Sequence, residues 1–382
     1  MVPRRARGRR DTLSVAGAMR PVVRATSPPG RLRHEGVGSR AAFACVAALA
    51  LFGAAPAHAQ FVDPLDLPAE PTALAARGLL NAVAGAGSRL VAVGQRGHVV
   101  LSDDGGVTWT QAAVPVSSDL TGVHFASPSR GWAVGHGGVV LTTDDGGRSW
   151  AKQLDGRRIG PLLAARYGAG ARGPLREQIA ALSAPTADWP LLDVWFDDER
   201  SGFAVGAFNL ILRTDDGGAS WTPWLDRAEN PKSLHLHAIR RVGRDLYVAG
   251  EQGLLLRLDR AAQRFEAQRA GYGGSFFGVT GAGRTVLAFG LRGTVVRSDD
   301  GGATWRRVSV GVGSSLTGGA ALPDGRLVLA TQSGQLLVSA DGGGSFGRVE
   351  QARALPASAV LHAGGDAVVL VGAMGARVVR LR

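Results

Sequence analysis

The chain has 382 residues, 45% of them hydrophobic, with a formal net charge of +12 and one cysteine. Its first 59 residues hold ten arginines and two acids, which is +8 of that charge. The rest of the chain carries a net charge of +4, which is too small for the basic surface expected of a nucleic-acid-binding protein. Cys45 lies in the same leader, so disulfide and thiol chemistry are excluded for the rest of the chain.

The leader has the pattern of a secretory signal peptide. A basic segment precedes the apolar run 41–57, and a small-residue Ala-His-Ala pattern ends at Ala59. The run is too short for a membrane span. We predict cleavage after Ala59 and a periplasmic location for the product. Residues 1–18 show no second targeting signal, so Met19 is a candidate for the true first residue of the protein.

Downstream of the leader, one sequence unit recurs with a period near 40 residues. Each unit has three apolar runs separated by polar or glycine turns, then a box of the type SDDGGVTW or TDDGGRSW that leads into a last strand. Four short strands per unit are typical of a propeller blade. We predict an all-β, seven-bladed β-propeller over residues 60–382. Its units begin near Leu80, Leu120, Leu191, Leu236, Phe276, Leu316 and Ala359.

The seventh unit ends at Arg382 after only three predicted strands. Residues 61–71 precede the first unit, and their prolines suit an edge strand. We therefore expect residues 61–71 to supply the missing outer strand, which would also protect the last sheet edge.

The boxes are expected to be structural turns between the third and fourth strands of a blade. A carboxylate there can accept bonds from its own turn, glycine permits positive φ, and the aromatic buries apolar surface. A motif repeated around a ring does not form one active site. A calcium loop would need alternating oxygen ligands and a distal acid, which the boxes lack. The predicted box residues are Asp104, Trp109, Asp145, Trp150, Asp216, Trp221, Asp300, Trp305, Asp341 and Phe346.

An insertion over residues 151–190 separates the second and third units, and two of its stretches have helical apolar spacing. It joins the last strand of one blade to the first of the next, so it must emerge on the face that bears the turns between second and third strands. Long loops on a rigid scaffold often carry binding functions. We predict that a partner docks on this face; ordinary solvated hairpin tips are the alternative. The predicted positive contacts are Arg96, Arg157, Arg158 and Arg292.

The boxes match the Asp-box of the BNR repeat, and the whole unit resembles that of the photosystem II stability/assembly-factor family. Residues 120–150 and 191–221 carry the resemblance best. The resemblance implies a seven-bladed periplasmic or lumenal propeller that helps to assemble a membrane protein complex by binding its subunits. We predict a monomer without cofactors. The fourth unit has lost its box at 258–262, and 151–190 is inserted. These departures leave open a client other than a photosystem.

A carbohydrate-active or glycan-binding BNR propeller, such as a sialidase-like glycoside hydrolase, is the alternative. That activity would need a tyrosine nucleophile paired with a glutamate, and Tyr167, Tyr247 and Tyr272 have no adjacent acid that suggests such a pair. His235 and His237 would share one face of a strand but lack a nearby third metal ligand. We therefore predict no catalytic, metal-binding or cofactor-binding residues, and no enzymatic activity.

Overall fold

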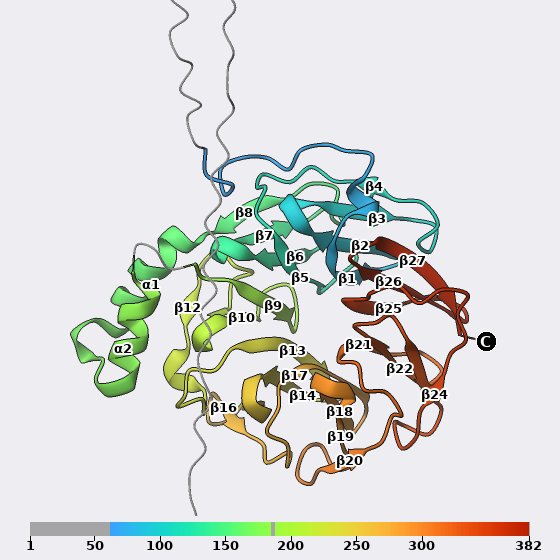
Figure 1. The fold of residues 1–382 in the computed structure, drawn as a ribbon. Coiled ribbons are helices and arrows are strands. Elements are labelled where there is room, and N and C mark those ends of the chain that lie inside the picture. Colours follow the sequence, from blue (N-terminus) through green and yellow to red (C-terminus); the bar gives the residue numbers. More distant parts are fainter. Residues whose placement is uncertain (1–61, 185–187, 382) are drawn as a thin grey trace, which may run out of the picture. The chain divides into compact units, whose positions relative to one another are not determined.

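Seven small antiparallel sheets succeed one another around a ring (Figure 1). The structure is a computed structural model that describes residues 62–184 and 188–381; the leader and its predicted cleavage site lie outside them. Six sheets have four strands in chain order, and the last has three. The predicted seven-bladed propeller is confirmed, and the first strand of every blade begins at the residue that the repeat predicted.

The strands of the seven blades are β1 (Leu80–Ala86), β2 (Arg89–Gly94), β3 (Val99–Ser102) and β4 (Thr110–Gln111); β5 (Leu120–Phe125), β6 (Gly131–Gly135), β7 (Val140–Thr143) and β8 (Ala151–Leu154); β9 (Leu191–Phe196), β10 (Gly202–Gly206), β11 (Ile211–Thr214) and β12 (Thr222–Pro223); β13 (Leu236–Val242), β14 (Asp245–Gly250), β15 (Leu255–Asp259) and β16 (Arg264–Ala267); β17 (Phe276–Ala282), β18 (Thr285–Gly290), β19 (Val295–Ser298) and β20 (Arg306–Val308); β21 (Leu316–Ala321), β22 (Leu327–Thr331), β23 (Leu336–Ser339) and β24 (Gly347–Arg348); and β25 (Ala359–Gly364), β26 (Ala367–Gly372) and β27 (Gly375–Arg380). Short 3-10 turns are η1 (Ala75–Arg77), η2 (Gln95–Gly97), η3 (His136–Gly138), η4 (Gly156–Arg158), η5 (Gly168–Gly170), η6 (Ala207–Asn209), η7 (Leu225–Arg227), η8 (Glu251–Gly253) and η9 (Leu291–Gly293).

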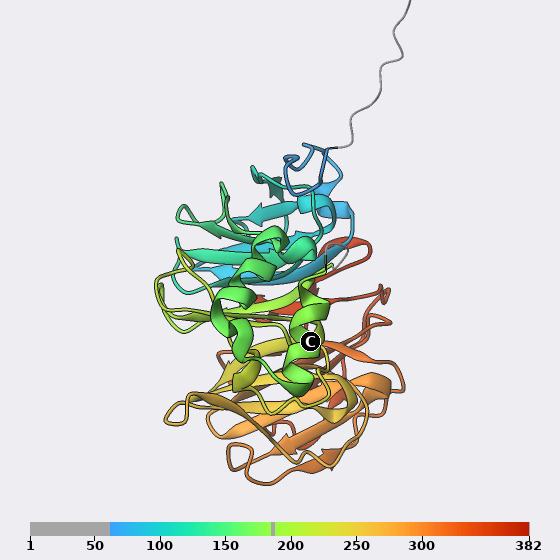
Figure 2. The same ribbon diagram turned by 90° about the vertical axis from the view of Figure 1, so that its left-hand side faces the viewer.

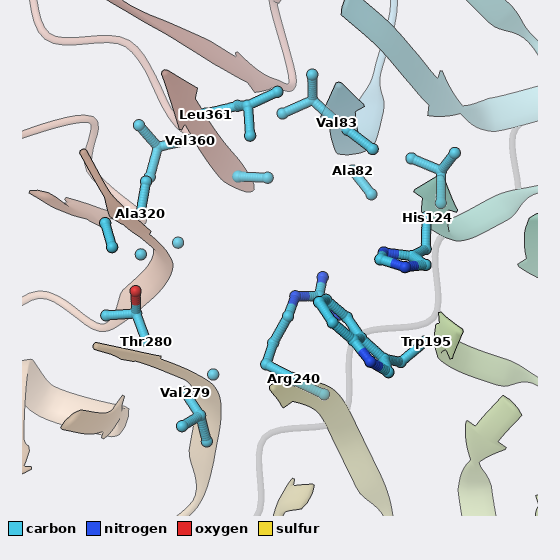
Figure 3. A pocket seen from close by; sticks show the side chains of 18 of the residues that line it. Ala82, Val83, His124, Trp195, Arg240, Val279, Thr280, Ala320, Val360 and Leu361 are labelled. Carbon is cyan, nitrogen blue, oxygen red and sulfur yellow. The ribbon is translucent and has the colours of Figure 1, made fainter. Parts of the chain in front are cut away.

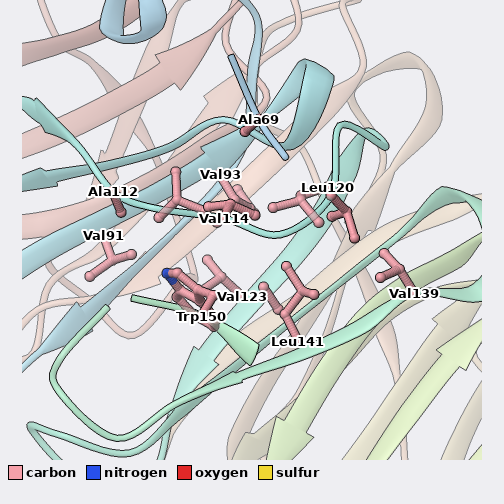
Figure 4. Close-up of a cluster of buried hydrophobic side chains, with 14 of the residues drawn as sticks. Ala69, Val91, Val93, Ala112, Val114, Leu120, Val123, Val139, Leu141 and Trp150 are labelled. Atoms are coloured by element: carbon pink, nitrogen blue, oxygen red, sulfur yellow. The ribbon is translucent and has the colours of Figure 1, made fainter. Parts of the chain in front are cut away.

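The core lies between adjacent blades rather than within one. The second strands are buried along almost their whole length, as β6 is, because each sheet is covered by a neighbouring sheet on both faces. Between the first two blades, Val91 and Val123 pack with Leu141 and Trp150 in one cluster (Figure 4). The apolar runs of the repeat therefore form strands because two partner sheets bury them, which removes a large apolar surface from water.

The first strands line a central channel, and the first six of them carry a bulge near their start. In β1 the register with β2 shifts between Leu80 and Ala82, and β13 has the same shift between Leu236 and Ala238. A bulge redirects side chains locally. It places His237 at the extra residue, while His235 precedes the strand, so the predicted sharing of one strand face by these two histidines is wrong.

The seventh blade is not completed by residues 61–71, and that prediction is wrong. The N–H of Ala69 donates to the carbonyl of Val114 (3.0 Å), and the N–H of Ser117 donates to the carbonyl of Pro64 (2.8 Å). Leu65 and Ala69 are buried in the cluster between the first two blades. The segment lies on the first two blades because burying these side chains removes apolar area from water.

The insertion contains two helices, α1 (Ile159–Tyr167) and α2 (Gly173–Leu182), which lie beside the second and third blades (Figure 2). Asp155 caps the entrance by accepting from the N–H of Arg157 (3.2 Å). α1 ends at Tyr167, because Gly168 follows it with a φ of 44° that does not continue a helix. Ile159 and Leu163 are fully buried in the cluster between these blades. The insertion is therefore part of the propeller core. Within the described ranges, no helix is long and apolar enough to cross a membrane.

Candidate docking face and central channel

The carboxylate of each box is held by donors from its own turn. Asp145 accepts from the hydroxyl of Thr143 (2.8 Å) and from the N–H (3.0 Å) and hydroxyl (2.6 Å) of Ser149. Burial raises the pKa of Asp145, but these donors outweigh burial and lower it to about 2. Asp104, Asp216, Asp300 and Asp341 accept from the matching Ser or Thr side chains and also have lowered pKa values.

The closing aromatic completes the turn from the other side. The indole N–H of Trp150 donates to the carbonyl of Gly147 at 3.0 Å, and Trp109 and Trp305 make the same bond at 3.0 Å. Trp221 is buried, but its N–H has no acceptor among the described residues, and Phe346 has no donor. Gly147 lies at φ 87°, where a side chain would be strained.

The fourth blade replaces its box with a turn that the repeat did not predict. The carboxylate of Asp259 accepts from the N–H groups of Ala261 (2.8 Å) and Ala262 (2.9 Å). Across the part of the chain that the structure describes, no three His, Cys, Asp or Glu side chains gather as a metal site. The geometry of the boxes is that of hydrogen-bonded turns.

The face that carries the insertion, which we call the insertion face, also carries the turns between second and third strands. The N–H of Gly137 in η3 donates to Asp188 (3.1 Å), and the side chain of Gln178 on α2 donates to the carbonyl of Phe208 in η6. The N-terminal segment lies on this face too, because the side chain of Lys152 donates to the carbonyl of Leu65 (2.6 Å).

The four predicted arginines differ in their surroundings on this face. Arg157 pairs with Asp66 (2.7 Å) and with Asp155 (2.5 Å), so it fastens the N-terminal segment to the insertion. The side chain of neighbouring Arg158 donates to the carbonyl of Gln153 at 3.0 Å. Arg96 and Arg292 stand at the tips of η2 and η9, in different blades, with φ near 54° and 55°. No ion pair joins either of them to a described residue.

The repeat did not single out the apolar side chains that this face exposes. Eight large hydrophobic side chains are exposed among the described residues, and six of them lie in the N-terminal segment or at hairpin tips of the insertion face. Of the other two, Val107 lies in a box turn and Val378 on β27. The sequence did contain one signal for this apolar surface: Phe208 stands at a hairpin tip where other units have Arg, Gly or Gln. The exposed apolar set comprises Val62, Leu67, Leu74, Phe208, Leu291 and Met374.

Phe208 is the largest side chain in the exposed apolar set. It is 50% exposed and has φ 53°, in the left-handed region. Its ring lies 4.6 Å from that of His235. A groove of about 580 Å³ runs between α2 and the turn at 231–233, and Phe208 and Leu182 are among its lining side chains. The insertion thus adds an apolar recess next to an exposed aromatic ring.

The central channel holds a cavity of about 440 Å³ with one polar wall (Figure 3). His124, Trp195 and Arg240 stand together, whereas Val360 and Leu361 across the channel are apolar. Arg240 pairs with Asp193, whose side chain is only 4% exposed. The rings of His124 and Trp195 are 4.1 Å apart, and Nε2 of His124 lies 2.9 Å from the carbonyl of Phe196.

Electrostatics keep His124 neutral in this wall. Burial lowers the pKa of His124, and the positive charge of Arg240 lowers it further, to about 3. The ring nitrogen near the Phe196 carbonyl therefore donates its proton to that oxygen.

The tyrosines that the hydrolase alternative needs are engaged elsewhere. Tyr247 donates to the carbonyl of Gly301 (2.9 Å) and Tyr272 to that of Leu291 (3.2 Å). The hydroxyl of Tyr167 lies 2.8 Å from a carboxylate oxygen of Asp226, beside the insertion. None of them lines the cavity of the channel.

Comparisons with known proteins agree with the predicted resemblance. A family model described as "Photosynthesis system II assembly factor YCF48" matches residues 102–159 and 176–272. The chain is 30% identical over 117 residues to the photosystem II assembly lipoprotein Ycf48 of Synechococcus sp. (strain CC9902), covering 30% of this chain and 35% of that protein. It is 30% identical over 84 residues to the chloroplastic photosystem II stability/assembly factor HCF136 of Arabidopsis thaliana, covering 22% and 20%. The matches thus span about a third and a fifth of these relatives.

Two solved structures share the fold. "YCF48 bound to D1 peptide" has a TM-score of 0.60 and 16% identity, and the match covers 80% of this chain and 94% of that one. YCF48 from Cyanidioschyzon merolae has a TM-score of 0.57 and 16% identity, covering 81% and 96%. The resemblance to the photosystem II stability/assembly-factor family is confirmed.

Proposed function

We propose that this photosystem II assembly-factor-like propeller is a non-catalytic docking protein that binds a segment of a membrane-protein subunit through its insertion face. Export to the periplasm is part of the proposal and rests on the predicted signal peptide. A YCF48 propeller of the same fold has been solved with a D1 peptide bound, which supports a polypeptide segment as the ligand. The client of this chain is a subunit, or an assembly intermediate, of a membrane complex.

The observation that carries the proposal is the gathering of the exposed apolar set on one face. Single exposed hydrophobic residues are ordinary, but apolar surface concentrated on one face marks an interaction site. Six of the eight exposed large hydrophobic side chains among the described residues are on the insertion face. Burying part of this surface against a client would stabilise a complex by about 25 cal/mol per Å² of apolar area removed from water.

Phe208 strengthens this argument because its backbone is unfavourable for phenylalanine. A side chain other than Gly, Asn or Asp in the left-handed region costs about 1–2 kcal/mol. The equivalent tip of the second blade is Gly137, which carries no such cost. A bulky ring that is both strained and exposed contributes little to the stability of the fold, which favours a role in binding.

The arginine tips supply charge around the apolar surface. Arg96 and Arg292 are not in ion pairs with described residues, and guanidinium groups suit interfaces because they are weakly hydrated and bind carboxylates through two donors. Charges at the rim of an interface mainly affect association rate and salt dependence. We expect Arg96→Glu with Arg292→Glu to slow client binding without changing the melting temperature.

The test compares two variants at equivalent tips. Phe208→Asn removes the ring and relieves the strain, and Gln252→Asn makes the same change where φ is 51° but the side chain is polar. Crosslinking in cells followed by mass spectrometry should recover integral membrane proteins with the native protein and with Gln252→Asn, and far less with Phe208→Asn. Both variants should melt no lower than the native protein, because Asn tolerates this backbone region.

Equal recovery with Phe208→Asn and the native protein would refute docking at the insertion face. Turnover of sialosides or aryl glycosides that is abolished by Tyr272→Phe or Tyr247→Phe would instead support the hydrolase alternative.

A further inference from the structure

The seventh blade differs from the others in the number of its strands. In the first six blades the third strand pairs with a fourth, as β19 does with β20 through Val296 and Arg307. β27 is the third strand of the seventh blade and pairs only with β26 among the described strands. One edge of β27 is therefore open among the described residues, and we call it the open edge.

Hydrogen bonds in the other blades show which backbone groups of β27 meet the open edge. In four blades the carbonyl that follows the tip turn accepts from the N–H of the residue directly after the fourth strand. Its equivalent in the seventh blade is Ala376, which pairs with Val371 as Val99 pairs with Val93. No backbone N–H of a described residue reaches the Ala376 carbonyl from that side. The four donor–acceptor pairs are Ala112 to Val99, Trp224 to Ile211, Gln268 to Leu255, and Val349 to Leu336.

Backbone groups alternate in direction along a strand, so Val378 also presents its N–H and C=O to this edge. The side chains of β27 are also less buried than those of other third strands. The third strands β3 and β7 are buried at every residue, whereas only Gly375 of β27 is buried and Val378 is 39% exposed. Ala376 is covered by Ala75 and Ala76 of η1, but from Val378 onward no described residue gives this edge the hydrogen bonds or the side-chain cover that its counterparts have.

Neither described end of the chain can complete this sheet. The described residues end at Leu381, one residue after β27, and Leu381 donates its N–H to the carbonyl of Asp366 (3.0 Å). At the other end, the segment around Pro64 and Ala69 pairs with residues 114–117 of the first blade. A strand that fills the edge must come from outside the described residues.

Charge indicates the chemistry of that strand. Arg377 and Arg380 lie on β27, and the Cα of Arg77 lies beside Gly375. None of these three arginines is in an ion pair with a described residue, but the guanidinium of Arg377 donates to the carbonyl of Leu355 (2.8 Å). Arg77 and Arg380 are exposed. A second copy of β27 would bring a second set of positive charges to this edge, whereas an acidic strand supplies charge of the opposite sign. On facing strands of a sheet, opposite charges are stabilising and like charges are destabilising.

We propose that the open edge of β27 binds an extended, acidic segment of another protein, which adds as the fourth strand of the seventh blade. Strand addition of this kind gives affinity through main-chain hydrogen bonds, and glutamate or aspartate side chains next to the strand would meet the exposed charges of Arg77 and Arg380. This site is on the rim of the propeller and does not depend on docking at the insertion face.

The probe is a short synthetic peptide in which glutamate alternates with valine, compared with its lysine counterpart. Affinity is measured on the full chain by fluorescence anisotropy, and the site by hydrogen exchange at β27. Val378→Pro removes the N–H that points to the open edge and leaves the hydrogen bonds between β26 and β27 in place. Val378→Ala is the control, because it also loses the valine side chain but keeps that N–H. We expect the glutamate peptide to protect the amides of Ala376 and Val378, and Val378→Pro to weaken binding by about tenfold or more.

The controls distinguish the other occupants. Val378→Ala should retain binding, and Arg380→Gln should weaken it by about fivefold, the upper range for one exposed ion pair. Equal binding of the glutamate and lysine peptides, or unchanged affinity in Val378→Pro, would overturn the proposal. Protection of the Ala376 and Val378 amides in the free protein, equal to that of Val99 and Leu101, would show that its own chain fills the edge. A dimer that Val378→Pro dissociates would assign the edge to a second copy.

Discussion

The adjacent acids Asp144 and Asp145 give a matched test of whether a box is a turn or a cation site. Asp145 accepts bonds from Thr143 and Ser149, whereas Asp144 is exposed and accepts none from a described residue. We expect Asp145→Asn to destabilise the protein because a carboxamide cannot accept all three bonds. Asp144→Asn, which makes the same chemical change one residue away, should leave stability within about 0.5 kcal/mol of the native value.

The magnitude follows from the lowered pKa of Asp145. A decrease from 3.8 to about 2 corresponds to at most about 2.4 kcal/mol. The carboxylate is only partly buried, so solvent screening reduces the expected loss to about 1 kcal/mol at pH 7. Because the folded-state pKa is depressed, this contribution is complete above the ordinary value near 4 and is lost as pH falls through about 2. The difference between native protein and Asp145→Asn should therefore be about half as large at pH 3.

The assay is urea unfolding of the native protein, Asp144→Asn and Asp145→Asn at pH 7 and pH 3. Each series is run with calcium and with a chelator. Equal losses for the two variants, a loss independent of pH, or a stabilisation by calcium that Asp145→Asn abolishes would refute the interpretation of the box as a hydrogen-bonded turn.

Two further predictions follow from buried groups. Leu163→Ala should cost about 3 kcal/mol of unfolding free energy, since this fully buried side chain joins α1 to the propeller core. Leu162→Ala, at a partly buried position, is the control. Equally small losses for both variants in chemical denaturation would show that the insertion is not part of the core. The ring of His124 should stay neutral down to about pH 4 in an NMR titration, because burial and Arg240 lower its pKa to about 3. Since the ordinary pKa is 6.5, His124 should reduce stability progressively as pH falls from 6.5 towards 3, and His124→Gln should remove that part of the pH dependence.

Local periodicity made the architecture predictable. The first strands begin where the repeat placed them, including Leu80 and Ala359, because each blade uses the same alternation of apolar runs and turns. The box bonds were predictable for the same reason, since Asp145 bonds to residues two and four positions away. Interactions over such short separations depend on residue types that the sequence shows side by side.

The insertion face was predictable in position but not in chemistry. Strand order alone places residues 151–190 with the tips that carry Arg96 and Arg292, and the structure agrees. The pairing of Arg157 with Asp66 joins residues 91 positions apart, and no spacing in the sequence indicates it. The exposure of Phe208 likewise depends on what the neighbouring blade leaves uncovered, so the residue most useful for testing docking was not predicted.

The number of blades, the start of each blade and the turn that each box forms were predictable from local patterns, because they depend on contacts within about forty residues. The positions of Leu65 and Ala69, the attachment of α1 to the core and the edge of β27 that no described strand covers emerge only in the folded molecule. These features depend on packing between residues that are far apart in the sequence. Residues 61–71 have the sequence pattern of an edge strand, but burial of Leu65 and Ala69 between the first two blades removes their apolar surface from water and holds the segment there.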